Sequence, residues 1–192
     1  MNITVYLGAS SGNSAKYAVA AEELGKWIGE NGHSLIYGGS REGLMGALAG
    51  GALKAGAHVT GVEPAFFIDS QLQLEELPEL IITKDMAERK KIMIEKGDAY
   101  IAFPGGTGTL EEITEIMSMT ALSAFTGGEK GSLRKPCILF NLDGYYNDLR
   151  KLLNQMIQEG FSTQERLSRI FFADSLEEIA DLLTAPEESE NP

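Results

Sequence analysis

The sequence predicts an α/β fold: a Rossmann-like, doubly wound, mostly parallel sheet with helices on both faces, in three layers. Short and nearly continuous apolar runs alternate with longer segments of helical periodicity along the chain. Such runs are typical of strands that are buried on both faces, as in a parallel sheet. Glycine-rich turns follow several runs at the carboxyl ends of the expected strands, where folds of this class bind their ligands.

The apolar runs expected to form strands are residues 3–7, 34–37, 58–62, 80–83, 99–103, 136–140 and 169–172. The segments with apolar residues on one helical face are 14–30, 44–54, 85–96, 110–124, 145–159 and 175–183. Asn31-Gly32 is a stop signal for the first helix, and Ser175-x-x-Glu178 is a capping pattern that opens the last. Residues 64–78 and 125–135 are expected to be loops, because neither shows a regular pattern.

Length and composition favour one soluble domain. The chain has 192 residues, of which we assign 1–184 to a single nucleotide-binding α/β domain and 185–192 to a disordered acidic tail. The formal net charge of -12 argues against nucleic acid as a partner, since phosphate backbones select basic surfaces. No apolar run reaches about 18 residues and no signal peptide is evident, so we expect a cytoplasmic protein without a membrane span. The single cysteine, Cys137, lies in an apolar run and is expected to be a buried thiol.

The most informative stretch is Pro104-Gly-Gly-Thr-Gly-Thr109, between an expected strand and an expected helix. Glycines let the backbone approach a ligand closely, and the free N–H groups of a first helical turn attract anions. A phosphate group is therefore the expected ligand of Gly105, Gly106, Thr107, Gly108 and Thr109. Glu112 needs its own explanation, because a bound phosphate would repel a carboxylate so close to it. We therefore expect Glu112 to have a function there.

Two common nucleotide folds do not fit. The first turn, Gly8-Ala-Ser-Ser-Gly12, is not G-x-G-x-x-G, and no acidic residue ends the second strand, where Tyr37-Gly38-Gly39 stands. The stretch at residues 104–109 also lacks the Lys-Ser/Thr pair of a P-loop. Neither NAD binding nor ATP hydrolysis is supported. No His, Cys or Asp cluster has metal-ligand spacing, so we expect neither a metal nor a cofactor.

The residues from Pro104 to Glu112 match PGGxGTxxE, the signature of the Lonely Guy (LOG) family. Further motifs in the same order strengthen the resemblance, which covers about residues 2–183: Gly8-Ala-Ser-Ser-Gly12, Tyr37-Gly-Gly39, Gly43-Leu-Met-Gly46, Glu88-Arg-Lys90 with Met93, and Gly144-Tyr-Tyr146. The resemblance implies a phosphoribohydrolase that cleaves the N-glycosidic bond of cytokinin riboside 5'-monophosphates, and often AMP, to give free base and ribose 5-phosphate. It also implies a homodimer with the motif helix near the contact.

The chain departs from the family pattern in three places. Ala87 stands where the family often has His, and Ser40 replaces a frequent third glycine. The segment 118–135 lacks the usual Trp after the motif helix. Because this segment would touch the base or the subunit contact, the resemblance leaves the preferred base open.

The resemblance assigns catalysis to Glu112 and Arg89. Glu112 would stabilise an oxocarbenium-like ribose and activate water, as carboxylates do in glycosidic cleavage. Arg89 shares a helix side with Met86 and Met93, on or beside the buried face, where a guanidinium needs a partner. The other expected substrate contacts are Gly8, Ser10, Gly39, Met86 and Lys90, beside the glycines and threonines of residues 105–109.

Other interpretations stay open at this stage. Thr109-x-x-Glu112 is also a capping box, which would give Glu112 a structural role. Leu110, Ile113 and Met117 suggest a helix stripe facing the sheet, and a second stripe of Ile116, Met119 and Leu122 suggests a dimer contact. A non-catalytic nucleotide-binding or sensing protein is the main alternative function, and a transferase that uses a phosphoribosyl group is a third.

Overall fold

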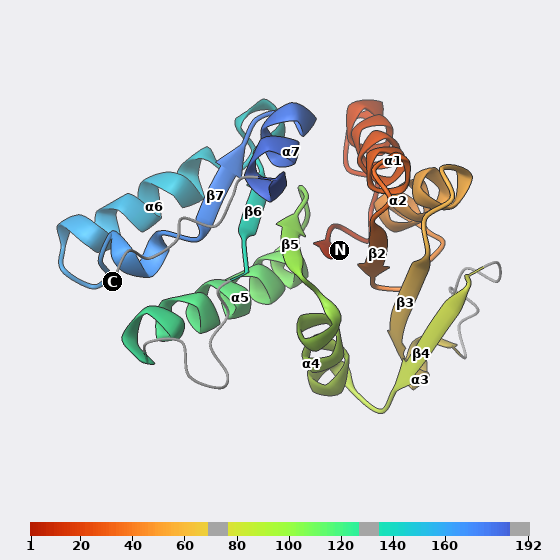
Figure 1. The fold of residues 1–192 in the computed structure, drawn as a ribbon, viewed down its shortest axis with the longest axis horizontal. Coiled ribbons are helices and arrows are strands. Elements are labelled where there is room, and N and C mark those ends of the chain that lie inside the picture. The colour runs from red at the N-terminus through yellow and green to blue at the C-terminus, as the bar shows by residue number, and fades with distance from the viewer. Residues whose placement is uncertain (69–76, 127–134, 185–192) are drawn as a thin grey trace.

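The computed structural model describes residues 1–68, 77–126 and 135–184 (Figure 1). The strands are β1 (Asn2–Tyr6), β2 (Ser34–Tyr37), β3 (Val59–Pro64), β4 (Glu79–Thr83), β5 (Ala99–Ala102), β6 (Cys137–Phe140) and β7 (Ile170–Ala173). The α-helices are α1 (Ala15–Glu30), α2 (Gly43–Lys54), α3 (Ala65–Ile68), α4 (Met86–Lys96), α5 (Thr107–Thr126), α6 (Asn147–Gln158) and α7 (Leu176–Thr184). Two 3₁₀ turns, η1 (Leu142–Gly144) and η2 (Glu165–Leu167), flank α6.

The strands form one sheet in the order β4-β3-β2-β1-β5-β6-β7, and every neighbouring pair is parallel. This confirms the predicted α/β fold. The chain builds outward from β1 to β4 on one side and then returns to place β5 on the other side of β1. The strand order therefore reverses between β1 and β5, and the helices that follow these two strands, α1 and α5, lie on opposite faces of the sheet. In such sheets this is the crevice where ligands bind.

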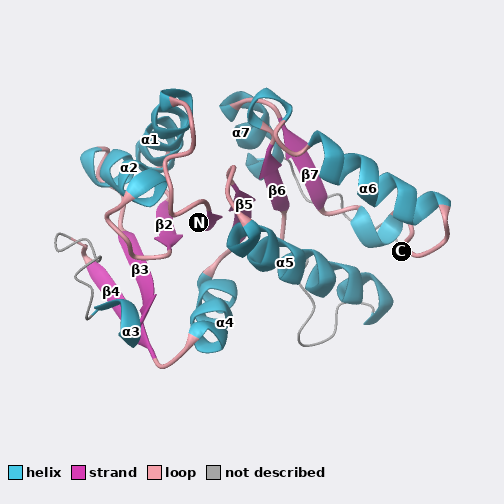
Figure 2. Cartoon of the chain, turned by 180° about the vertical axis from the view of Figure 1, so that it is seen from behind, coloured by secondary structure: helices cyan, strands magenta, loops and turns pink. Residues whose placement is uncertain are grey.

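Helices cover both faces of the sheet, which gives the three predicted layers (Figures 1 and 2). Helices α1, α2 and α7 pack on the face that carries Ile3, Val5 and Leu35. Helices α4, α5 and α6 pack on the opposite face, with Tyr6 and Ile36. Alternate residues of a strand thus enter different cores, which is why the strands read as continuous apolar runs.

Local signals set the helix ends as expected. The Ser14 hydroxyl accepts a hydrogen bond from the Lys16 N–H at the start of α1, and Gly32 follows its end with a φ of 69°. At the start of α4 the Asp85 carboxylate accepts the Glu88 N–H at 2.8 Å. This cap matters for the site, because it fixes the helix that carries Arg89.

Helix α5 differs from the prediction in its start and in its buried face. It begins at Thr107, and Leu110 is 42% exposed whereas Ile116 is completely buried. The predicted inward stripe is therefore confirmed for Ile113 and Met117, which are buried, and wrong for Leu110; the predicted surface position of Ile116 was also wrong. The physical reason is that the buried face includes Thr109 and Glu112, two polar residues that a count of apolar positions assigns to the outside.

The predicted loop at residues 64–78 begins as β3 ends and continues as the single turn of α3. The rest of that loop (69–76), most of the loop predicted at 125–135, and the predicted tail (185–192) lie outside the described residues. Cys137 is fully buried in β6, as expected, and burial raises the pKa of its thiol. Among the helices of the described ranges, none is long and apolar enough to cross a membrane.

Candidate active site

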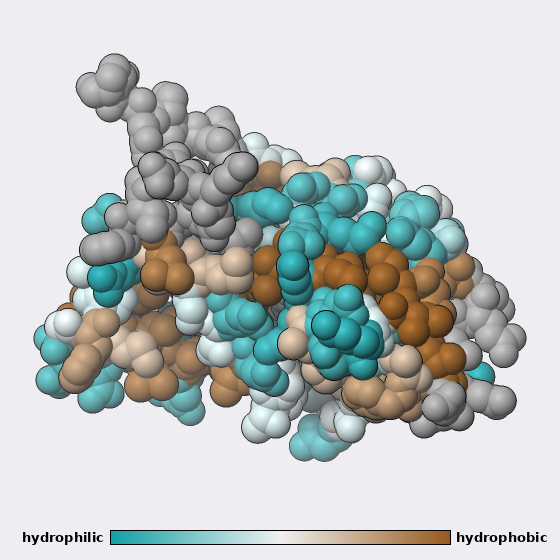
Figure 3. All heavy atoms as spheres, turned by 90° about the horizontal axis from the view of Figure 1, so that it is seen from below, coloured by the Kyte–Doolittle hydropathy of each residue, from teal (hydrophilic) through white to brown (hydrophobic). Residues whose placement is uncertain are grey.

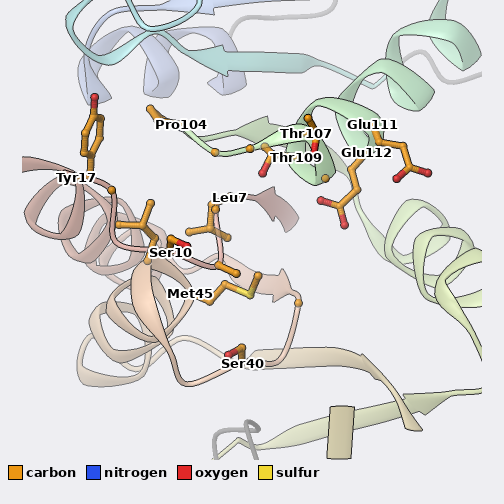
Figure 4. A pocket seen from close by; sticks show the side chains of 18 of the residues that line it. Leu7, Ser10, Tyr17, Ser40, Met45, Pro104, Thr107, Thr109, Glu111 and Glu112 are labelled. Carbon is orange, nitrogen blue, oxygen red and sulfur yellow. The ribbon is translucent and has the colours of Figure 1, made fainter. Parts of the chain in front are cut away.

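A cavity of about 800 Å³ opens at the carboxyl edge of the sheet, where the strand order reverses between β1 and β5 (Figure 4). Its lining comes from the loops after β1, β2 and β5, the end of β3, and the starts of α4 and α5. The two central loops contact each other, since the Gly8 N–H points to the Pro104 carbonyl at 3.4 Å. The predicted convergence of the glycine-rich turns on one crevice is therefore what the structure shows.

The loop from Pro104 to Gly106 leads directly into the amino terminus of α5. Gly105 must lack a side chain, because a Cβ there would lie 2.2 Å from the Thr109 hydroxyl oxygen and 2.7 Å from the Gly8 nitrogen. Gly106 and Gly108 face open space, with no atom within 4 Å of a built Cβ. The first turn of α5 lines the cavity from Thr107 to Thr109, as an anion site at a helix amino terminus requires.

Two tyrosine side chains hold this loop through hydrogen bonds to its backbone carbonyls. The Tyr145 hydroxyl donates to the Gly105 carbonyl at 2.6 Å, and the Tyr146 hydroxyl donates to the Phe103 carbonyl at 2.8 Å. Both tyrosines follow β6, so a strand on the far side of β5 fixes the position of the loop. The loop is therefore preorganised by the fold before any ligand binds.

A buried ion pair between α4 and α5 borders the same cavity. Arg89 Nη1 donates to Glu112 Oε1 at 2.7 Å, and each side chain is only 9% exposed. Arg89 Nε donates to the Val62 carbonyl at 2.9 Å, which fixes the guanidinium against the end of β3. Gly38 makes room for it, since a Cβ there would lie 2.4 Å from Arg89 Nη2.

The environment of Glu112 affects its protonation. Burial raises the pKa of the Glu112 carboxyl, while the adjacent Arg89 guanidinium opposes that rise. In Figure 4 the Glu112 side chain points toward the cavity from the first turns of α5. The neighbouring Glu111 also borders the cavity, but its side chain is 64% exposed and pairs with Lys90. The site thus combines the amino terminus of a helix with a positioned carboxylate one turn further along, in a largely buried setting.

Comparisons with known proteins agree with this geometry. A profile of the family described as "Possible lysine decarboxylase" matches residues 45–183. The cytokinin riboside 5'-monophosphate phosphoribohydrolase of Rhodococcoides fascians is 38% identical over 186 residues, which cover 96% of this chain and 90% of that protein. A protein of the same name from Arabidopsis thaliana is 36% identical over 181 residues, or 94% of this chain and 81% of that protein. The chain belongs to the LOG family.

Solved structures show the same fold. The molybdenum cofactor binding protein of Rippkaea orientalis matches with a TM-score of 0.67 at 25% identity, covering 96% of this chain and 95% of that one. The molybdenum cofactor carrier protein of Chlamydomonas reinhardtii matches with a TM-score of 0.68 at 22% identity, covering 95% and 97%. The second likeness concerns the fold alone.

Most residues that the LOG resemblance assigned to the site do line the cavity. They are Gly8, Ser10, Met86, Arg89, Gly105, Gly106, Thr107, Gly108, Thr109 and Glu112. Met86 is 37% exposed at the start of α4, one turn before Arg89, so its side chain is available to a ligand. Residues far apart in sequence are thereby brought together by the strand order, as expected.

Two of the assigned residues lie elsewhere. Lys90 Nζ pairs with Glu111 at 2.7 Å and Glu115 at 3.0 Å, and it is not among the described residues that line the cavity. Its helix position is adjacent to that of Arg89, but the acidic side chains of α5 draw it to the outer side of the α4–α5 contact. Gly39 is not among the described residues that line the cavity, whereas its neighbours Gly38 and Ser40 are.

Sequence reasoning missed two lining residues of chemical interest. Tyr145 was noticed only as part of a motif, without a role, and its hydroxyl holds the glycine-rich loop after β5. Glu63 was not singled out at all. It directly follows the apolar run 58–62, at the carboxyl end of a predicted strand, and that position was the available signal. Among the described residues, no group of His, Cys, Asp and Glu is arranged to hold a metal ion.

Proposed function

We propose that the protein is a nucleoside 5'-monophosphate phosphoribohydrolase. Its substrate is a cytokinin riboside 5'-monophosphate, AMP or both, and its products are the free base and ribose 5-phosphate. The observation that carries this proposal is the buried Arg89–Glu112 pair, which faces the cavity one helical turn beyond the glycine-rich loop. The names of the relatives from Rhodococcoides fascians and Arabidopsis thaliana support the same reaction.

In this proposal the loop and the first turn of α5 bind the 5'-phosphate. The N–H groups from Gly106 to Thr109 supply donors and the positive end of the helix dipole, which attract the phosphate locally although the chain has a net charge of -12. No cation is needed at the phosphate for this binding mode, although the Thr107 and Thr109 hydroxyls border the same space. A phosphate held there places the ribose towards the Arg89–Glu112 pair.

Hydrolysis then proceeds by attack of water on the anomeric carbon. The bond between that carbon and the base nitrogen breaks, its electron pair leaves with the base, and the base takes up a proton. The Glu112 carboxylate stabilises the positive charge that develops on the ribose and accepts the proton of the attacking water. Arg89 keeps that carboxylate ionised and oriented, because it donates directly to Oε1.

The lining does not favour the chemistry that the family profile's description suggests. A pyridoxal phosphate decarboxylase needs a lysine at the reacting centre to form a Schiff base. None of the described residues that line the cavity is a lysine. The non-catalytic alternative is disfavoured for another reason: a buried carboxylate–guanidinium pair is costly to maintain in a simple binding site.

The test uses Glu112→Gln with Glu111→Gln as its matched control. Both substitutions remove one carboxylate from the same turn of α5, but Glu111 is 64% exposed and pairs with Lys90. Free base is followed by chromatography after incubation with AMP and with isopentenyladenosine monophosphate. We expect Glu112→Gln to lose at least about 100-fold in kcat while still binding nucleotide, and Glu111→Gln to retain activity. Full activity of Glu112→Gln would refute the mechanism.

We also propose a homodimer that uses the face bearing α4 and α5. Figure 3 shows apolar side chains gathered in a band across this side of the molecule. Large exposed apolar residues there include Met86, Leu110 and Leu122. Light scattering of the purified protein tests this proposal.

The expected cytoplasmic location stays a prediction from the sequence.

A further inference from the structure

Glu63 is a buried acidic residue in the cavity that no part of the mechanism uses. It is the penultimate residue of β3, a strand that is buried along its whole length, and it is only 2% exposed. It lines the cavity, yet its Oε2 atom has no hydrogen-bond partner among the described residues. A buried carboxyl oxygen without a donor is unfavourable and calls for an explanation.

The surrounding backbone leaves space for this carboxyl but does not satisfy it. A Cβ on Gly39 would lie 3.1 Å from Glu63 Cβ and 3.4 Å from Oε2. The glycine at position 39 therefore leaves room for the Glu63 side chain. Arg89 is the nearby cation, but its Nη1 and Nε donors are directed to Glu112 and to the Val62 carbonyl. Burial raises the pKa of Glu63, and Arg89 opposes the rise. Whether ionised or protonated, the carboxyl keeps an oxygen that can accept a hydrogen bond.

The position of Glu63 along the cavity indicates which part of a nucleotide it would meet. Strand β3 lies three positions from β5 in the sheet, or about 14 Å at the usual strand spacing. The phosphate loop follows β5, and the Arg89–Glu112 pair spans the distance from α5 to the end of β3. A nucleotide whose phosphate lies on the loop and whose ribose lies at the pair therefore directs its base towards Glu63.

The chemical character of the cavity lining also changes from α5 towards Glu63. Near α5 it is mostly polar, with glycines, the Thr107 and Thr109 hydroxyls on one side of the view in Figure 4, and the carboxylates of Glu111 and Glu112. The lining from α2, α3 and α4 includes Met45, Phe67 and Met86, which are apolar. Apolar walls with one or two placed polar groups are typical of sites for flat heterocyclic ligands. Glu63 is the acidic group at this end.

We propose that Glu63 accepts a hydrogen bond from an amino group of the base and thereby selects nucleotides whose base carries such a donor. This inference rests on the proposed function, since it assumes a nucleotide with its phosphate on the α5 loop. A base that offers an amino group would satisfy the buried oxygen. A base without one would leave the carboxyl unpaired inside the complex, and discrimination of this kind is strong.

The test compares AMP with purine riboside 5'-monophosphate, which differs only by lacking the 6-amino group. For the wild-type protein we expect kcat/KM to be about 10- to 100-fold higher for AMP. Glu63→Leu should reduce this ratio to near 1, and Glu63→Gln, which keeps an acceptor oxygen, should retain most of it. Inhibition by inorganic phosphate should be unchanged in both variants, because the phosphate loop is remote from Glu63.

Three results would overturn the inference. The first is a wild-type protein that shows no preference for AMP, and this result does not depend on how the variants fold. The second is an unchanged ratio in a folded Glu63→Leu variant. The third is a loss in Glu63→Leu of discrimination between AMP and 2'-deoxy-AMP in place of the base preference, which would assign Glu63 to the sugar. Calorimetric binding of the same nucleotides to Glu112→Gln measures the base preference without turnover, so a failure of the proposed hydrolysis is distinguishable from a failure of this inference.

Discussion

Replacing Arg89 by methionine should destabilise the folded protein by about 3–5 kcal/mol near pH 8, and by much less near pH 5. The Arg89 side chain is 9% exposed and donates to Glu112 at 2.7 Å and to the Val62 carbonyl at 2.9 Å. Methionine fills a similar elongated space but donates to neither. The Glu112 carboxylate would then be buried without its counter-ion, and removing one partner of a buried pair is far more costly than removing both.

The pH dependence follows from the protonation of Glu112. Burial already raises its pKa above the ordinary 4.5, and the loss of the opposing Arg89 charge should raise it further. A carboxyl with a higher pKa in the folded state binds more protons when folded than when unfolded. Stability therefore falls as the pH rises above the unfolded pKa, by about 1.4 kcal/mol per pH unit, until the folded pKa is passed. The deficit relative to wild type should be smallest at low pH.

Urea unfolding followed by circular dichroism, at several pH values between about 5 and 8, measures this deficit. The control is the double variant Arg89→Met/Glu112→Gln, which has no carboxylate to leave unpaired at this position. Because Arg89 also acts on Glu63, and Glu63 is present in both variants, the difference between them isolates Glu112. A deficit that is equal at both ends of the pH range, or that persists undiminished in the double variant, would refute the reasoning.

Two further predictions concern packing and catalysis. Gly51→Ala should destabilise the protein by about 1–3 kcal/mol in thermal or urea unfolding, because its Cβ would lie 2.2 Å from the Glu22 carbonyl oxygen of α1. Gly50→Ala, the adjacent control with no atom within 4 Å, should stabilise it by about 0.5–1 kcal/mol, and equal effects would contradict the packing argument. The kcat/KM for AMP should fall towards low pH with an apparent pKa above 4.5, because burial raises the pKa of Glu112 and its ionised form is the reactive one. This acidic limb should persist in Glu63→Gln; its disappearance there would assign it to Glu63.

Much of the fold could be predicted because its signals are local. The apolar run at 34–37 is β2 residue for residue, and the helix expected at 85–96 is α4 with Asp85 as its cap. The face of α5 could not be predicted in the same way. Its buried side includes Thr109 and Glu112, and only the contact with Arg89 on another helix makes burial of that carboxylate tolerable. That contact is a property of the folded chain.

In the site too, some features follow from local sequence patterns and others depend on contacts in the folded chain. The glycines and threonines of residues 105–109 are adjacent in sequence, so their pattern alone predicted an anion site, and in the structure these residues line the cavity. The direction of a side chain on a helix was also predictable for Arg89. For Lys90 a helical projection gives a direction but no partner, and Glu111 and Glu115 on α5 decide where it points. For Glu63 the sequence shows a position at the carboxyl end of a strand, but which cavity residues it meets depends on the pairing of β3 with β2.

The buried polar residues of the described chain separate into two groups, and the separation bears on function. Most of the neutral ones are satisfied by neighbouring protein groups; the Thr4 hydroxyl, for example, donates to the Met93 carbonyl. The charged ones that are buried are Glu63, Arg89 and Glu112, and all three border one cavity. One guanidinium thus serves two carboxyls, and burial raises the pKa of both acids despite it. A core selected for stability alone would not keep two buried carboxyls beside a single guanidinium. A ligand that brings its own hydrogen-bond donors, in addition to a phosphate for the helix terminus, would correct it, and an aminated nucleotide has both.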